Sequence, residues 1–127
     1  MNVMKMREWI QVQLNVASIT FSCGGPSHQF RNFVYNLVLI FAYSVLKDTL
    51  LEMQDKNVFV SKKTNLGFLM KKSKSKINWI DFEVLDQGRE IRNQIAHENK
   101  IIKRVECWKY IDAIDAQLIA WDVFGNE

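Results

Sequence analysis

The stretch HQFRNFVYNLVLIFAYSVLKDTLLEMQ, residues 28–54, is the segment of the chain that decides the fold. Its apolar residues recur at spacings of three and four over a wide arc, which predicts one long helix. That arc contains Phe30, Phe33, Val34, Leu37, Val38, Phe41, Val45 and Leu46. A helix that is apolar over so much of its circumference must be covered by several neighbours. The segment therefore predicts the central core helix of a bundle.

The same segment is not predicted to span a membrane. Its most apolar run, residues 33–46, contains Asn36 and Ser44 and is shorter than the roughly 18 residues that a span needs. The first nine residues are too polar to open a secretory signal peptide. We therefore expect a cytoplasmic protein that does not contact a membrane.

Length and composition favour one folded domain over residues 1–127. The chain is 48% hydrophobic and carries a net charge of +3, which argues against disorder and only weakly for an anionic partner. Two cysteines, Cys23 and Cys107, lack the spacing of a metal site or a disulfide framework and fit a reducing cytosol. Cys107 lies in a helical apolar pattern, so we expect it in or near the core.

The chain outside this segment is also predicted to be helical. It has one proline and five glycines, so few residues interrupt its helices. Helices are expected over residues 3–20, 78–97 and 101–123, with a short helix inside a connector at 55–76. The sequence thus predicts an all-α, four-to-five-helix up-and-down bundle with a lysine-rich connector before the helix at 78–97.

Two of these helices carry a defined apolar face. The face of the helix at 78–97 contains Ile80, Val84, Gly88, Ile91 and Ile95. That of the last helix contains Ile101, Val105, Trp108, Ile111, Ile114, Leu118 and Trp121. Gly88 weakens its helix, so its place on the apolar face predicts a close approach by another helix.

The connector is strongly basic. No acidic residue occurs between Lys56 and Lys76, and the lysines of the cluster are Lys62, Lys63, Lys71, Lys72, Lys74 and Lys76. Such a cluster binds an RNA backbone by charge and counterion release, for which Lys71, Lys72, Lys74 and Lys76 are the candidates. A solvated loop that keeps the protein soluble is an equally good interpretation.

The residues most suggestive of chemistry are Arg92-Asn93-Gln94-Ile95-Ala96-His97. Arginine binds phosphate oxygens with two prongs, and histidine transfers protons near neutral pH. On an ideal helix Arg92 and His97 point about 140° apart. Asn93 and His97 share a face, which Arg89 extends by one turn. No metal-ligand spacing or glycine-rich phosphate loop is present, so no metal or cofactor is expected.

A structural interpretation of the same residues stays open. Arg92 would then pair with Glu90, Asp86 or a neighbouring helix, and His97 would cap the end of its helix, where a positive charge suits the helix dipole.

The string Arg92-Asn93-x-x-Ala96-His97 resembles the R-x4-6-H motif of the HEPN superfamily, a family of all-α bundles. In that family the motif ends a core helix and one more long helix follows, an order that residues 28–122 reproduce. Many members are metal-independent endoribonucleases of toxin–antitoxin or anti-phage systems, and they act as homodimers whose motifs meet in one composite site.

The resemblance implies roles for three residues. Arg92 would hold the scissile phosphate, His97 would act as general base or acid, and Asn93 would orient the phosphate or the partner's histidine. Arg89 and the connector lysines would bind RNA, and the products would carry 2′,3′-cyclic phosphate and 5′-hydroxyl ends. An antitoxin or defence-complex protein is a further expected partner.

One position departs from the family. In the toxin branch that pairs with nucleotidyltransferase antitoxins, a tyrosine that is the target of modification follows two residues after the histidine, whereas here the residue is Asn99. Silencing by modification of that tyrosine is therefore not expected. The alternative function is a catalytically silent HEPN-like module that binds RNA or a protein partner.

Overall fold

The computed structural model describes residues 28–98 and 100–121, and within them every regular element is a helix. The prediction of an all-α bundle is confirmed. The helices are α2 (His28–Asp55), α3 (Leu66–Ser73), α4 (Phe82–Glu98) and α5 (Arg104–Ala120). The helix expected over residues 3–20 lies outside the described residues.

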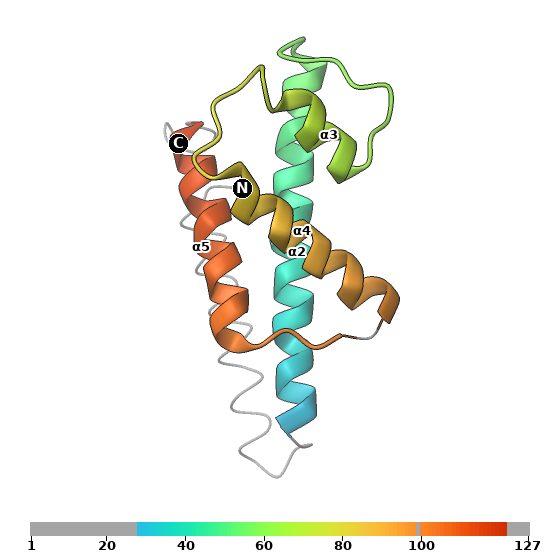
Figure 1. The fold of residues 1–127 in the computed structure, drawn as a ribbon, viewed down its shortest axis with the longest axis vertical. Helices are drawn as coiled ribbons and strands as arrows, with labels where there is room; N and C mark the ends of the chain where they lie inside the picture. Colours follow the sequence, from blue (N-terminus) through green and yellow to red (C-terminus); the bar gives the residue numbers. More distant parts are fainter. Residues whose placement is uncertain (1–27, 99, 122–127) are drawn as a thin grey trace.

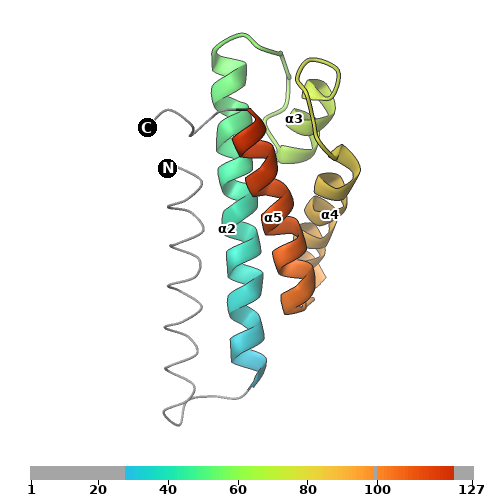
Figure 2. The same cartoon turned by 90° about the vertical axis from the view of Figure 1, so that its left-hand side faces the viewer.

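The long helix α2 is the spine of the bundle. It contacts each of the other three helices, and α4 also contacts α3 and α5. Figures 1 and 2 show α2 and α5 side by side and running in the same direction, with α4 crossing them obliquely in the opposite sense. The short α3 packs beside the C-terminal half of α2 (Figure 1). This arrangement surrounds one side of α4 with apolar partners and leaves its C-terminal end at the edge of the bundle.

The core is built on one face of α2. Five residues of α2 have no exposed surface: Leu39, Ala42, Tyr43, Leu46 and Leu50. Their burial explains why the apolar arc of this helix is wide. The predicted apolar arc was wrong at Leu37, whose side chain is 62% exposed. The predicted bounds of this helix, 28–54, differ from those observed by one residue.

Within the described residues one stretch, Val34–Asp55, is long and apolar enough to cross a membrane by length and composition alone, with a mean hydropathy of 1.4. Half of that stretch is buried against the rest of the protein. A bundle's core helix meets the same criterion, and the buried face of α2 is of that kind.

The helix α4 begins at Phe82, four residues later than predicted, because side chains of α5 and of its C-cap residue satisfy the backbone before it. The carbonyl oxygen of Asn78 accepts hydrogen bonds from Gln117 Nε2 at 3.0 Å and Trp121 Nε1 at 2.7 Å. The amide of Ile80 donates to Gln117 Oε1 at 2.7 Å. Asp81 Oδ1 then accepts from the Val84 amide, as an N-cap does. Ile80, predicted on the helix face, instead lies in the connector and is 62% exposed.

The helix α5 likewise begins later than predicted, at Arg104 instead of residue 101. The buried Asn36 of α2 donates from Nδ2 to the Lys100 carbonyl at 2.9 Å and accepts from the Ile102 amide at 2.8 Å. These two bonds hold the backbone of the connector extended. The predicted apolar face of this helix was therefore wrong at its start, where Val105 is 81% exposed, and correct at Ile111, Ile114 and Leu118, which are buried.

We expect Asn36→Ala to lower the free energy of unfolding by about 2–3 kcal/mol, because it leaves the buried Ile102 amide and the partly buried Lys100 carbonyl without partners. Urea denaturation followed by tryptophan fluorescence measures the change. Gln94→Ala is the matched control, since it removes only an exposed bond to Lys100 in the same connector. Equal, small effects of both substitutions would contradict the clamp.

The prediction that Cys107 lies in the core is confirmed, and its thiol gives a pH dependence. The side chain is fully buried, its Sγ lies 3.5 Å from the Tyr35 carbonyl oxygen, and burial raises the pKa of the thiol from 9.0 to about 12. The unfolded thiol therefore loses its proton first as the pH rises, so stability present below pH 9 is lost between about 9 and 12.

We expect the free energy of unfolding to be about 1.4 kcal/mol lower at pH 10 than at pH 8 through Cys107 alone. The difference between wild type and Cys107→Ala isolates this contribution from that of buried tyrosines. A difference that does not change between the two pH values would contradict it.

Candidate functional site

The six motif residues occupy the C-terminal half of α4, the part of the helix that reaches the edge of the bundle (Figure 1). Ile95 is buried and fixes the rotation of the helix, with Ile91 partly buried on the same side. Arg92 and Asn93 are therefore half-buried at the border of the apolar face, and His97 is exposed in the last turn. The polar strip predicted from spacing thus lies at a rim of the packed core.

Arg89, one turn before Arg92, is neutralised by acidic residues of its own helix. Its Nε lies 2.9 Å from Asp86 Oδ1 and its Nη2 lies 2.7 Å from Glu90 Oε1. Burial alone would lower the pKa of Arg89, but the bonds and charges of Asp86 and Glu90 outweigh it and raise that pKa. Both acids that were considered as partners for Arg92 are therefore bound to Arg89 instead.

Arg92 has no acidic partner among the described residues. Its Nη2 donates to Asn93 Oδ1 at 3.1 Å, and this neutral amide is the hydrogen-bond acceptor that the structure gives it. Burial and the nearby positive charge of Arg89 lower the pKa of Arg92, while Tyr43 opposes that shift. A half-buried guanidinium without a carboxylate retains most of its capacity to bind an anion.

The buried Tyr43 of α2 contacts α4 one to two turns before the motif. Its hydroxyl donates to the Leu85 carbonyl at 2.8 Å, and burial is the largest cause that raises its pKa far above the usual range. A Cβ added at Gly88 would meet the same hydroxyl and would lie 2.7 Å from Tyr110 Cδ1. The close approach predicted at Gly88 is therefore confirmed, and it brings α2, α4 and α5 together beneath the motif.

His97 has an open imidazole. The side chain is exposed, and among the described residues no hydrogen bond orients it. It lies five residues after Arg92, so the two side chains point in different directions from one helix. The connector that follows is held to α2 by Asn36, which fixes where the chain turns away from His97.

The lysines named as RNA-binding candidates differ in their surroundings. Lys71 and Lys72 are exposed on α3, and Lys76 is exposed in the connector that follows. Lys74 is engaged, since its Nζ lies 3.5 Å from Glu83 Oε1 and 4.6 Å from the centre of the Phe82 ring. Arg89 links the two regions, because a Cβ added at Gly67 in α3 would lie 3.2 Å from Arg89 Nη1.

Sequence reasoning missed two residues that position the site. Asn36 looked like an interruption of an apolar run, and Tyr43 was not considered, although a polar group inside a core helix requires a buried partner. That requirement was the available signal. No group of three or more histidine, cysteine, aspartate and glutamate side chains within residues 28–98 and 100–121 is arranged to hold a metal ion.

Comparison with models of protein families, with curated proteins and with solved structures finds no match to this chain. Function must therefore be argued from the residues themselves.

Proposed function

We propose that this protein is a metal-independent endoribonuclease of the HEPN type that acts as a cytoplasmic homodimer. The observation that carries the proposal is the state of Arg92: half-buried, bonded to the neutral Asn93 and without a carboxylate, while Arg89 binds both nearby acids. A retained, uncompensated guanidinium suits a phosphodiester better than a structural role, in which it would bond to another helix.

The chemistry follows from the residues at the rim. Arg92 holds the scissile phosphate and stabilises the negative charge that develops on it. His97 removes the proton from the 2′-hydroxyl, whose oxygen attacks phosphorus as the bond to the 5′-oxygen breaks. The leaving 5′-oxygen takes a proton from water, the protonated His97 returns its proton to the solvent, and the products end in a 2′,3′-cyclic phosphate and a 5′-hydroxyl. Asn93, bonded to Arg92, holds the guanidinium in place.

The dimer answers a geometric problem. Arg92 and His97 diverge on one helix, so an arginine of one subunit would act with a histidine of the other. Exposed apolar side chains at Leu37, Ile101 and Val105 support the presence of an interface. They belong to α2, the connector after the motif and the first turn of α5. An antitoxin or defence-complex protein is the partner that would restrain such an enzyme.

The second candidate function is a silent helical module that binds RNA or such a protein partner. The observation that favours it is the imidazole of His97, which no described residue orients, whereas a general base is normally held by a neighbour. This module would bind RNA through the exposed Lys71, Lys72 and Lys76 without cutting it.

The test is incubation of purified protein with total RNA and tRNA in EDTA, with mapping of the new ends. We expect cleavage by wild type that EDTA does not affect, and at least a hundredfold loss, on the order expected for an essential acid–base residue, in His97→Ala. Arg92→Lys should fail similarly because it keeps the charge and loses the fork. His28→Ala is the matched control and should cleave normally. No cleavage by folded, dimeric wild type would favour the silent module.

A further inference from the structure

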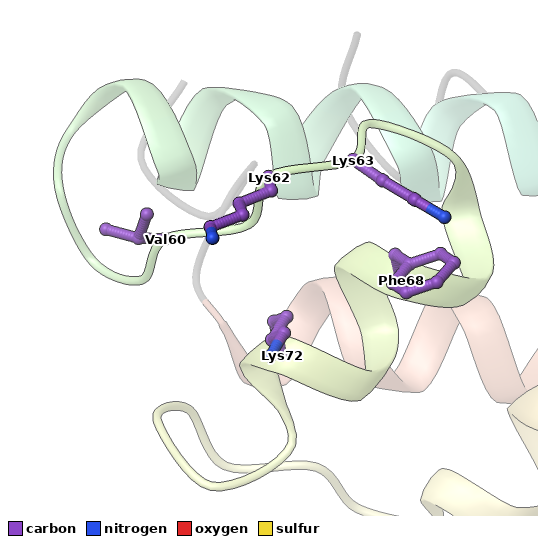
Figure 3. A pocket seen from close by; sticks show the side chains of 5 residues that line it. All are labelled: Val60, Lys62, Lys63, Phe68 and Lys72. Carbon is purple, nitrogen blue, oxygen red and sulfur yellow. The ribbon is translucent and has the colours of Figure 1, made fainter.

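A second basic site lies away from the motif, between the connector after α2 and the outer side of α3. It is a pocket of about 370 Å³ lined by Val60, Lys62, Lys63, Phe68 and Lys72. Figure 3 shows the first three residues on the connector and the last two on one side of α3. Phe68 and Lys72 are four apart, which places them on the same helix face.

The connector that carries Lys62 and Lys63 is anchored. Ser61 is buried, its amide donates to Gln54 Oε1 at 3.0 Å, and its hydroxyl donates to the Lys63 carbonyl at 2.6 Å. Phe59 before it is 3% exposed, and Leu66 after it is 2% exposed. At the start of α3, Asn65 Oδ1 accepts from the Phe68 amide at 3.0 Å and caps the helix. The pocket walls are thus held by the core.

The charge of the pocket is not compensated. Its three lysines include no ion pair with an acid among the described residues, and no carboxylate lines the pocket. Lys74, by contrast, has Glu83. Three lysines line one hollow without a carboxylate among them, so the field there is positive and attracts an anion. Lys63 Nζ, 4.5 Å from the centre of the Phe68 ring, shows that the aromatic wall helps to hold a cation there.

The volume and the lining residues of the pocket indicate what kind of ligand it binds. A hollow of about 370 Å³ falls in the range of small-molecule sites and exceeds what one phosphate group fills. Val60 and Phe68 offer apolar and aromatic surface beside the ammonium groups. These are the two features that recognise a nucleotide: lysines bind its phosphate, and an aromatic side chain packs against its flat base.

We propose that this pocket binds one nucleotide, with its phosphate on Lys62, Lys63 and Lys72 and its base against Val60 and Phe68. The nucleotide comes either free from solution or as one unit of an RNA strand. The site is a binding site only, so it does not depend on cleavage by Arg92 and His97.

The experiment measures binding to full-length His97→Ala protein, so that cleavage does not interfere. The probes are AMP, ATP and a ten-nucleotide oligouridylate, all in EDTA, by calorimetry or fluorescence anisotropy. Lys72→Gln is compared with Lys109→Gln, because both lysines are exposed and carry the same charge, and of the two only Lys72 lines the pocket. Equal melting temperatures of the two variants show that both fold.

We expect Lys72→Gln to raise the Kd by about three- to tenfold, and Lys109→Gln by less than about twofold. If the oligouridylate is the ligand, the plot of log association constant against log salt concentration should also become less steep by about 0.7 for Lys72→Gln. Phe68→Leu should weaken binding of the same probe while keeping an apolar wall.

The outcomes separate the sources. Pocket-dependent binding of AMP or ATP identifies a free nucleotide, and pocket-dependent binding of the oligouridylate alone identifies an RNA strand. Equal effects of Lys109→Gln and Lys72→Gln would show diffuse charge attraction and overturn the pocket, as would no binding of any probe. If wild-type protein does not cleave RNA but the pocket still binds a probe, only the proposed function is overturned.

Discussion

Gly88→Ala is expected to lower the free energy of unfolding by about 2–4 kcal/mol, although alanine is the better helix former by about 1 kcal/mol. The added Cβ would meet the Tyr43 hydroxyl and would lie 2.7 and 2.9 Å from Tyr110 Cδ1 and Cγ. Both rings are buried in the core, so neither can swing away without moving α2 or α5. Displacing Tyr43 would also break its bond to the Leu85 carbonyl.

The matched control is Gly67→Ala in α3. There the added Cβ lies 3.2 Å from Arg89 Nη1, the end of a flexible side chain that can give way. We expect a change within about 0.5 kcal/mol, because the gain in helix propensity offsets the small adjustment. Urea denaturation monitored by tryptophan fluorescence compares the two variants directly.

A double-mutant cycle identifies the contact responsible. In a Tyr43→Phe background the hydroxyl is gone, so the cost of Gly88→Ala should be smaller by about 1 kcal/mol, and the remainder comes from Tyr110. Purely additive effects would show that Tyr43 does not lie against Gly88. A Gly88→Ala protein as stable as wild type would contradict the packing of α2, α4 and α5 at this point.

The glycine also shows how far the sequence alone could be read. Its position on an apolar face predicted a close helix approach, which is confirmed, and the periodicity of residues 28–54 predicted α2 nearly to the residue. Both signals are local. The identity of the partners, Tyr43 and Tyr110, depends on how three helices rotate against one another, and no local spacing encodes that rotation.

The helix starts that were wrong have one physical cause. The apolar patterns continue back to Ile80 and Ile101, but tertiary hydrogen bonds from Gln117, Trp121 and Asn36 hold those backbones in extended connectors. The sequence did carry one signal: Asp81, three residues before Val84, is a typical N-cap residue. At Ile101 no comparable local signal exists, since Lys103 at the N-cap position makes no side-chain capping bond.

At the candidate site, the sequence predicted which side chains share a rim but not which of them are neutralised. Arg89 and Arg92 look alike in the sequence, and both lie within six residues of Asp86 and Glu90. The structure assigns both acids to Arg89 and leaves Arg92 with Asn93. Spacing favours the pair of Asp86 with Arg89, which are three apart on the helix, but spacing does not decide which arginine Glu90 binds.

Equimolar mixing of Arg92→Ala and His97→Ala subunits is expected to restore RNA cleavage to about a quarter of the wild-type rate, although each variant alone is inactive. If a site combines Arg92 of one subunit with His97 of the other, each mixed dimer has one intact site and one site that lacks both residues. Half of the dimers are mixed after random exchange, and each has half its sites. The measurement is the initial rate of cleavage in EDTA after subunit exchange.

A second mixture tests the same geometry through loss of activity instead of recovery of activity. Wild type mixed equally with the double variant Arg92→Ala/His97→Ala should retain about a quarter of the activity if sites are shared, because every mixed dimer is then dead. If Arg92 and His97 act within one subunit, this mixture retains about half and the first mixture recovers nothing. Because the two residues point about 140° apart on one helix, we expect the shared pattern. Activity of about half in the second mixture would place the whole site on a single α4.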